Sequence, residues 1–176
     1  MIQTVINWLV NIISVIGYPG VFLAVLIESF FAPIPSELIL PFSGFVASQG
    51  EMNIFVVIIV ATLGAYLGSL PFYLVGKWGE KAVTNFLNKY GKYLFIEESD
   101  IEFSFKLFDK YGNGLVLFGR LIPIARTLIS FPAGVAKMPF FVFSVFTLLG
   151  SMLWNILLVY TGFLLSDNWE VVGVWV

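Results

Sequence analysis

Four charged side chains lie in stretches of the sequence that otherwise have the composition of a membrane segment. Two are acids, Glu28 and Glu37, and two are bases, Arg120 and Arg126. A charge at mid-bilayer costs roughly 2.5–3.5 kcal/mol, so four would cost on the order of 10–14 kcal/mol. That rivals the stability of a whole domain, about 5–15 kcal/mol. We therefore expect the four charges to pair in a buried or wet site, which usually marks a pathway for an ion or polar ligand.

The composition is that of an integral membrane protein. Of the 176 residues, 59% are hydrophobic and 11% are charged, whereas soluble domains carry about 25% charged residues. This length suits a single membrane domain, residues 1–176. The net charge of −2 argues against nucleic acid as a partner, because phosphate backbones are bound by clustered basic residues.

Histidine and cysteine are both absent from the sequence. This absence excludes histidine nucleophiles, Ser-His-Asp triads, histidine-ligated metals and thiolate chemistry. No nucleophile with an adjacent base is visible either. We therefore expect no metal, no cofactor and no enzymatic activity. No Lys or Arg precedes Lys77, so the N-terminus does not resemble a cleaved signal peptide.

The first fifty residues contain apolar runs that are too short to span a bilayer. Polar residues at helical spacing over residues 1–16 predict an interfacial amphipathic helix. Two apolar runs then flank Pro33 and Pro35 within residues 18–50. At 1.5 Å per residue each run covers about 15–18 Å of a hydrocarbon core about 30 Å thick. We therefore predict a re-entrant helical hairpin over 18–50, with one bent full span over residues 5–31 as the alternative.

The rest of the chain contains two long apolar segments and a charged loop. Residues 53–76 and 139–165 are each long enough to cross the membrane once. Residues 77–112 hold six of the seven lysines, which predicts a cytoplasmic amphipathic loop with short helices on the inner membrane surface. A second re-entrant hairpin is predicted over residues 113–137.

The two predicted hairpins are related in sequence. A shift of ninety residues places Pro33 over Pro123 and Gly44 over Gly134. Because a single crossing separates the hairpins, they would enter the bilayer from opposite sides, as in many secondary transporters. The predicted fold is an all-α integral membrane protein with two inverted re-entrant helical hairpins, transmembrane helices and interfacial amphipathic helices.

Three motifs resemble those of a known family. An E-x-x-x-x-P-x-P-S-E stretch runs from Glu28 to Glu37, and an F-x-R-x-x-P-x-x-R stretch from Phe118 to Arg126 precedes Ala133-Gly134. The third motif is a glycine- and tyrosine-containing helix: Gly64, Gly68, Tyr73 and Gly76. With these motifs, and a later Gly150-x-x-x-Trp154, the chain resembles the DedA family, also called the VTT or SNARE-associated domain family. The resemblance covers residues 17 to about 165.

The resemblance implies a multi-pass protein of the bacterial inner membrane that flips undecaprenyl phosphate or another phospholipid between leaflets, coupled to a proton or another ion. Arg120 and Arg126 would bind the phosphate through bidentate bonds. Glu28 and Glu37 would carry the coupling proton, because a carboxylate removed from water binds protons more readily. A proton or ion antiporter and a membrane-homeostasis protein without lipid transport remain as alternatives, and homo-oligomers are compatible with each.

The other motif residues have expected roles around this site. Ser36 and Thr127 are expected to cap the inner half-helices and to leave their N-termini facing the anion. Tyr73 could serve the site or anchor its helix at depth. The remaining residues are expected to shape turns or to allow close helix packing: Pro33, Pro35, Pro123, Gly64, Gly68, Gly76 and Gly134. A fixed salt-bridge network without a ligand is the structural alternative for the four charges. Family members often carry a further apolar helix after the last span, which is not seen before Val176.

Overall fold

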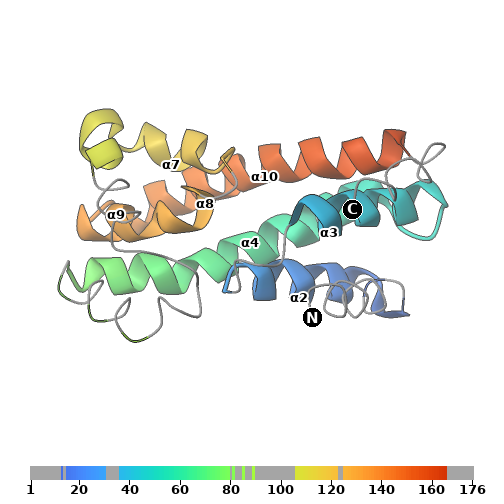
Figure 1. The fold of residues 1–176 in the computed structure, drawn as a ribbon, viewed down its shortest axis with the longest axis horizontal. Coiled ribbons are helices and arrows are strands. Elements are labelled where there is room, and N and C mark those ends of the chain that lie inside the picture. Colours follow the sequence, from blue (N-terminus) through green and yellow to red (C-terminus); the bar gives the residue numbers. More distant parts are fainter. Residues whose placement is uncertain are drawn as a thin grey trace.

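The computed structural model describes residues 13, 15–30, 36–79, 81, 85, 89, 106–122 and 125–165. Within these ranges the secondary structure is helical, without a strand, and the helices lie side by side in an elongated bundle (Figure 1). The predicted all-α class is therefore confirmed. Most of the predicted interfacial helix at 1–16, most of the charged loop at 77–112 and the proline turns at Pro33, Pro35 and Pro123 lie outside the described residues.

Two long apolar helices run the length of the molecule. They are α4 (Ile54–Lys77) and α10 (Phe140–Leu164), of 24 and 25 residues, and both are long and apolar enough to cross a membrane. Their bounds match the predicted spans at 53–76 and 139–165 to within a residue. They contact each other and run in opposite directions (Figure 1). Asn53 begins α4, and its side chain accepts a hydrogen bond of 2.9 Å from the Phe55 backbone N–H.

The first predicted hairpin consists of two short helices, α2 (Tyr18–Glu28) and α3 (Ser36–Ser48). Gly17, with φ of 66°, precedes α2, and this left-handed conformation suits glycine. Helices of 11 and 13 residues cover only about 16 and 20 Å. Neither is long enough to cross about 30 Å of hydrocarbon alone. Their re-entrant character remains a prediction.

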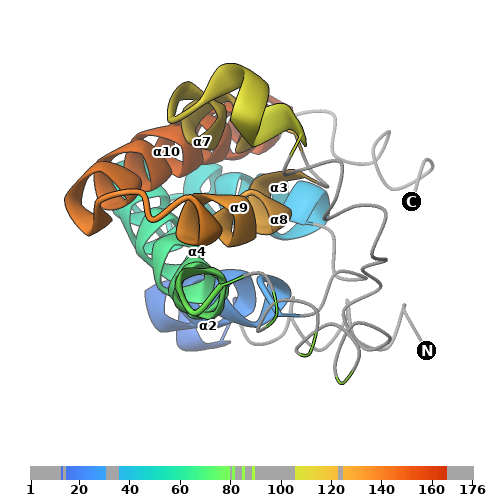
Figure 2. The same cartoon turned by 90° about the vertical axis from the view of Figure 1, so that its left-hand side faces the viewer.

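The second hairpin is divided into three shorter helices. They are α7 (Gly114–Gly119), α8 (Ala125–Leu128) and α9 (Ser130–Val135). The Ile129 N–H bonds the Ala125 carbonyl at 2.9 Å and the Ala133 N–H bonds the Ile129 carbonyl at 3.2 Å, so α8 and α9 form nearly one helix. Figure 2, which looks along the bundle, shows α2 beside α4 and α7 beside α10.

Each hairpin divides its contacts between the two long helices. The first helix of each hairpin packs on the long helix that follows it, α2 on α4 and α7 on α10. The last helix packs on the long helix of the other half, α3 on α10 and α9 on α4. The two halves are therefore interlocked.

Glycine contacts repeat the same relationship at the residue level. Four glycines lie so close to the backbone of another helix that a side chain on them would strike it. The contact of Gly44 with Val159 corresponds to that of Gly134 with Tyr73. The contact of Gly162 with Pro41 corresponds to that of Gly76 with Phe131. Related positions differ by 90 residues in the short helices (44 and 134, 41 and 131) and by 86 in the long ones (73 and 159, 76 and 162). The ninety-residue repeat predicted from sequence therefore has a counterpart in helix packing.

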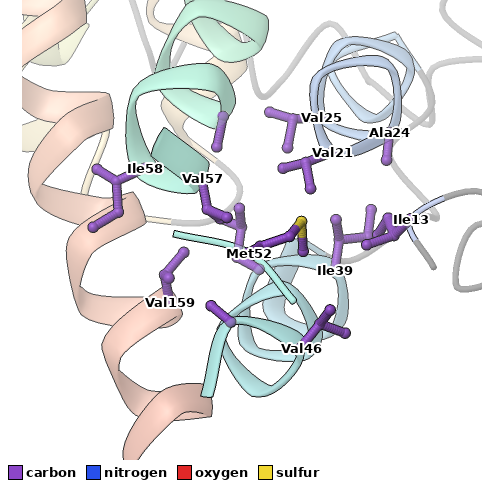
Figure 3. Packing of buried hydrophobic residues seen from close by; sticks show 13 residues of the cluster. Ile13, Val21, Ala24, Val25, Ile39, Val46, Met52, Val57, Ile58 and Val159 are labelled. Atoms are coloured by element: carbon purple, nitrogen blue, oxygen red, sulfur yellow. The ribbon is translucent and has the colours of Figure 1, made fainter. Parts of the chain in front are cut away.

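Apolar side chains from both halves form the core. Figure 3 shows Val21 and Val25 of α2 meeting Ile39 of α3, Val57 of α4 and Val159 of α10. Lipid is as apolar as these side chains, so between membrane helices close packing stabilises such a core more than exclusion of water does. This packing holds the ends of the short helices, which carry the charges, against the middle of the long ones.

Candidate functional site

The structure brings three of the four predicted charges together. Glu28 ends α2, Arg120 directly follows α7, and Arg126 lies in α8. All three line one cavity, where the Arg126 guanidinium forms an ion pair with Glu28. Glu37 is in the first turn of α3, is exposed and does not line this cavity.

The cavity lies halfway along the two long helices. Ala65 of α4 and Ser151 of α10 each occupy the twelfth position of their helix and line the cavity, as do Ser69 and Asn155 one turn later. It leaves about 20 Å³ for the centre of a water molecule, which is room for about one water. A phosphate group therefore requires the cavity to widen.

Arg120 is a buried cation whose partners are hydroxyl groups. The residue is 3% exposed. Its guanidinium donates to Ser130 at 3.1 Å and, at a longer 3.4 Å, to Ser151, while Nε–H has no partner among the residues described. No carboxylate in the described part of the chain forms an ion pair with it. Burying a charge without a counter-ion is costly, so the position favours an incoming anion.

Gly150 allows Arg120 to reach this position. A Cβ atom built on Gly150 would lie 2.7 Å from the Leu117 carbonyl oxygen and 3.1 Å from the Arg120 Cβ. Any side chain there would therefore push the end of α7 away from α10. The glycine holds Arg120 close to the middle of the long helix.

Glu28 and Arg126 form the second part of the site. The Glu28 side chain is 3% exposed and that of Arg126 is 20% exposed. One carboxylate oxygen, Oε1, is paired with Arg126, and the other, Oε2, is buried and has no hydrogen-bond partner within the described ranges. With all groups ionised, the one acid and two bases of the cavity give a net charge of +1. No cluster of three or more potential metal ligands occurs among the residues described, and the charge of the cavity suits an anion.

Neutral polar side chains connect the two long helices beside the cavity. Asn155 of α10 donates from Nδ2 to the Thr62 hydroxyl of α4 at 3.0 Å, and Thr62 donates to the Ile58 carbonyl at 2.7 Å. Ser130, Ser151, Asn155 and Thr62 were not among the residues predicted from sequence. The available signal was the four-residue spacing of Thr147, Ser151 and Asn155, which places them on one face of an apolar helix.

Comparison with known proteins identifies the family. The VTT domain matches residues 34–164. The chain belongs to the DedA (VTT-domain) family. This confirms the resemblance drawn from the three sequence motifs.

Several relatives in the DedA family match over most of their length. Undecaprenyl phosphate transporter A of Bacillus subtilis is 38% identical, with 97% of this chain and 80% of the relative covered. An "alkaline phosphatase-like protein" of Lactococcus lactis subsp. lactis is 42% identical over 94% of this chain and 78% of its own. Protein DedA of Escherichia coli is 25% identical over 80% of this chain and 67% of its own. No solved structure matches.

The DedA motif glycines and Tyr73 lie at helix contacts. A Cβ on Gly64 would lie 2.8 Å from the Phe22 carbonyl oxygen, and one on Gly68 would strike the Ser29 side chain. Tyr73 stacks on Phe143, with ring centroids 4.2 Å apart, and its hydroxyl donates to the Met138 carbonyl at 2.5 Å. None of these three motif residues lines the cavity. The side chains of Ser36 and Thr127 lie outside the described part of the structure, so their capping roles remain predictions.

Proposed function

We propose that this protein is a transporter that moves a polyisoprenyl phosphate, such as undecaprenyl phosphate, between the leaflets of the bacterial inner membrane. The observation that carries the proposal is Arg120, a buried guanidinium that is held by serine hydroxyls and forms no ion pair with a described carboxylate. The name of the Bacillus subtilis relative, undecaprenyl phosphate transporter A, supports the same class of ligand.

Phosphate binding would change the pairing of the charges in the cavity. A phosphate monoester carries about −1.5 to −2 charges at pH 7. The two negative charges of its dianion balance the positive charges of Arg120 and Arg126 if Glu28 is protonated and therefore neutral. Protonation of Glu28 also releases Arg126 from its ion pair and turns a carboxylate that would repel phosphate into a hydrogen-bond donor. Phosphate entry is therefore coupled to proton uptake by Glu28.

The interlocked halves offer a way to expose the cavity to each side in turn. In inverted-repeat transporters the two repeats exchange conformations around a fixed central site. Here the cavity is lined by related positions of both halves, Ala65 with Ser151 and Ser69 with Asn155. Movement of α3 along α10 would open one side, and the related movement of α9 along α4 would open the other.

The test is a leaflet-accessibility assay for undecaprenyl phosphate in liposomes that contain the purified protein. We expect Arg120→Ala and Arg126→Ala to lower the transport rate by a factor of roughly 30 or more, because truncating one member of a buried charged contact costs about 2–5 kcal/mol. Lys77→Ala, which removes an exposed positive charge at the end of α4, serves as the control and should keep the wild-type rate. Equal rates for all four proteins would refute the proposal.

A proton or ion antiporter is the second candidate, because one buried carboxylate oxygen of Glu28 accepts no hydrogen bond from the residues that the structure describes. The two candidates differ in whether lipid phosphate is needed. An antiporter would produce proton flux in liposomes without polyprenyl phosphate, whereas the proposed transporter would not. If phosphate entry needs a protonated Glu28, the transport rate should rise as the pH falls. Glu28→Gln should remove this increase. Glu37→Gln should retain more of this increase, because Glu37 is exposed outside the cavity.

A further inference from the structure

Trp154 lines the cavity of the proposed phosphate site and has a buried hydrogen-bond donor. The residue lines the cavity, and its indole Nε1–H is buried without a partner among the described residues. Buried tryptophan N–H groups usually find a hydrogen-bond partner, because an unmade bond leaves the group desolvated without compensation. An acceptor that enters the cavity would satisfy this N–H.

Two further polar groups of residues that line this cavity have no hydrogen-bond partner in the described part of the chain. They are the Arg120 Nε–H, a second donor, and Glu28 Oε2, an acceptor. Arg126 becomes a third source of donors once its ion pair with Glu28 opens. Three donor side chains, from the end of α7, from α8 and from α10, then face one small space.

The internal repeat indicates that the indole is not there for packing alone. Trp154 is the fifteenth residue of α10, and the fifteenth residue of α4 is Gly68. At Gly68 even a Cβ atom would strike Ser29. Arg120 differs from its counterpart in the same way. Arg120 lies against Gly150 in the second half, and the apolar Val25 lies against the related Gly64 in the first half. The second half of the chain therefore carries donors at positions where the first half carries small or apolar residues.

We infer that Trp154 donates its indole N–H to the phosphate as a third ligand-binding side chain, and that this donor selects phosphate monoesters over diesters. The inference rests on the proposed function. A monoester has three terminal oxygens, one for each of Arg120, Arg126 and Trp154. In a diester the third oxygen is esterified and is a weaker acceptor, so the indole would remain buried without a good partner.

The test compares the binding of a polyprenyl monophosphate with that of phosphatidylglycerol, a diester, to the full chain in detergent. Trp154→Phe keeps an aromatic ring and removes the N–H. We expect it to weaken binding of the monoester roughly tenfold, as expected for a lost hydrogen bond to a charged group, and binding of the diester less than twofold. Trp78→Phe is the matched control, because Trp78 lies at the end of α4 and is 77% exposed. Unchanged binding of the monoester by Trp154→Phe, or equal losses for both lipids, would overturn the inference.

A second measurement does not depend on the folding of Trp154→Phe. Replacing Trp8, Trp78, Trp169 and Trp175 with Phe leaves Trp154 as the only tryptophan, since the chain has five. The ¹⁵N–¹H indole resonance of this variant should move downfield with the monophosphate and stay in place with the unphosphorylated polyprenol. A stationary resonance with bound monophosphate would contradict the inference while leaving the proposed function intact. Failure of the wild-type protein to bind any monophosphate would overturn both.

Discussion

A single buried cation determines the electrostatic character of the cavity. Arg120 is held by Ser130 and Ser151, whereas Arg126 is already neutralised by Glu28. A site built only for stability would pair both bases or replace them with apolar side chains, because a buried ion pair is often no more stabilising than a packed hydrophobic residue. Arg120, which forms no ion pair with a described carboxylate, therefore favours a ligand that arrives with negative charge.

Replacing Arg120 with methionine separates binding from structure. Arg120→Met removes the uncompensated charge and keeps a long flexible side chain, so we expect phosphate binding to be lost while the free energy of unfolding is unchanged or rises, by up to about 1–4 kcal/mol. Thermal unfolding of the detergent-solubilised protein measures this, with the exposed Lys77→Met as control. If the charges instead form a fixed network that only supports the structure, Arg120→Met should clearly lower the free energy of unfolding.

At the scale of helices, small residues set how closely the charged ends approach the long helices. Gly150 fits under the end of α7, and Gly64 fits under α2 in the related position. Helix pairs of this kind come close because glycine has no side chain. The position of Arg120 thus depends on a residue that makes no polar contact with it.

Adding one methyl group at Gly150 should displace Arg120. The new Cβ would lie 2.7 Å from the Leu117 backbone oxygen, which cannot rotate away, so we expect Gly150→Ala to lower the free energy of unfolding by about 1–3 kcal/mol and to weaken phosphate binding. Gly114→Ala is the matched control, because a Cβ there meets no atom within 4 Å. Wild-type stability and binding in Gly150→Ala would show that α7 and α10 are not as tightly packed as described.

The helices and their ends were more predictable from sequence than the site. The apolar runs of α4 and α10 could be identified because runs of such length and hydropathy are typical of membrane-spanning helices. Intramembrane charges likewise pointed to Glu28, Arg120 and Arg126. Glu37 was also predicted to belong to the site, but it is exposed and does not line the cavity. Its charge alone does not tell which face of α3 it occupies. Ser151 and Asn155 were missed because a small polar residue in an apolar helix also satisfies itself locally, as Ser43 does with the Ile39 carbonyl at 2.8 Å.

On the scale of the whole molecule, the outer faces of the two long helices are apolar. Phe55 and Leu63 of α4 and Leu153 and Leu157 of α10 are among the exposed large hydrophobic residues. Exposed apolar residues on helices of this length are compatible with contact with lipid tails. Several of the buried polar residues line the cavity between the halves: Glu28, Ser69, Arg120, Ser151 and Asn155.

A charge on the outer face should therefore be tolerated near a helix end and not in its middle. Leu153→Asp lies in the middle of α10, and we expect it to weaken membrane insertion by about 2.5–3.5 kcal/mol. Phe55→Asp, at the second position of α4, should cost much less because the side chain can reach the interface. The fraction of each variant recovered in membranes after expression measures the difference, and equal recovery would argue against a membrane-spanning α10.

The interlocking of the halves also constrains the order in which the protein can be completed during synthesis. Gly44 of α3 packs against Val159 of α10, so α3 emerges from the ribosome more than a hundred residues before its partner does. Contacts between segments so far apart form late, since closing a long loop costs entropy before the contact stabilises it. The surface of α3 that packs on α10 must therefore stay uncovered until the last helix has been made. Chains interrupted before α10 would be the natural targets of membrane quality control.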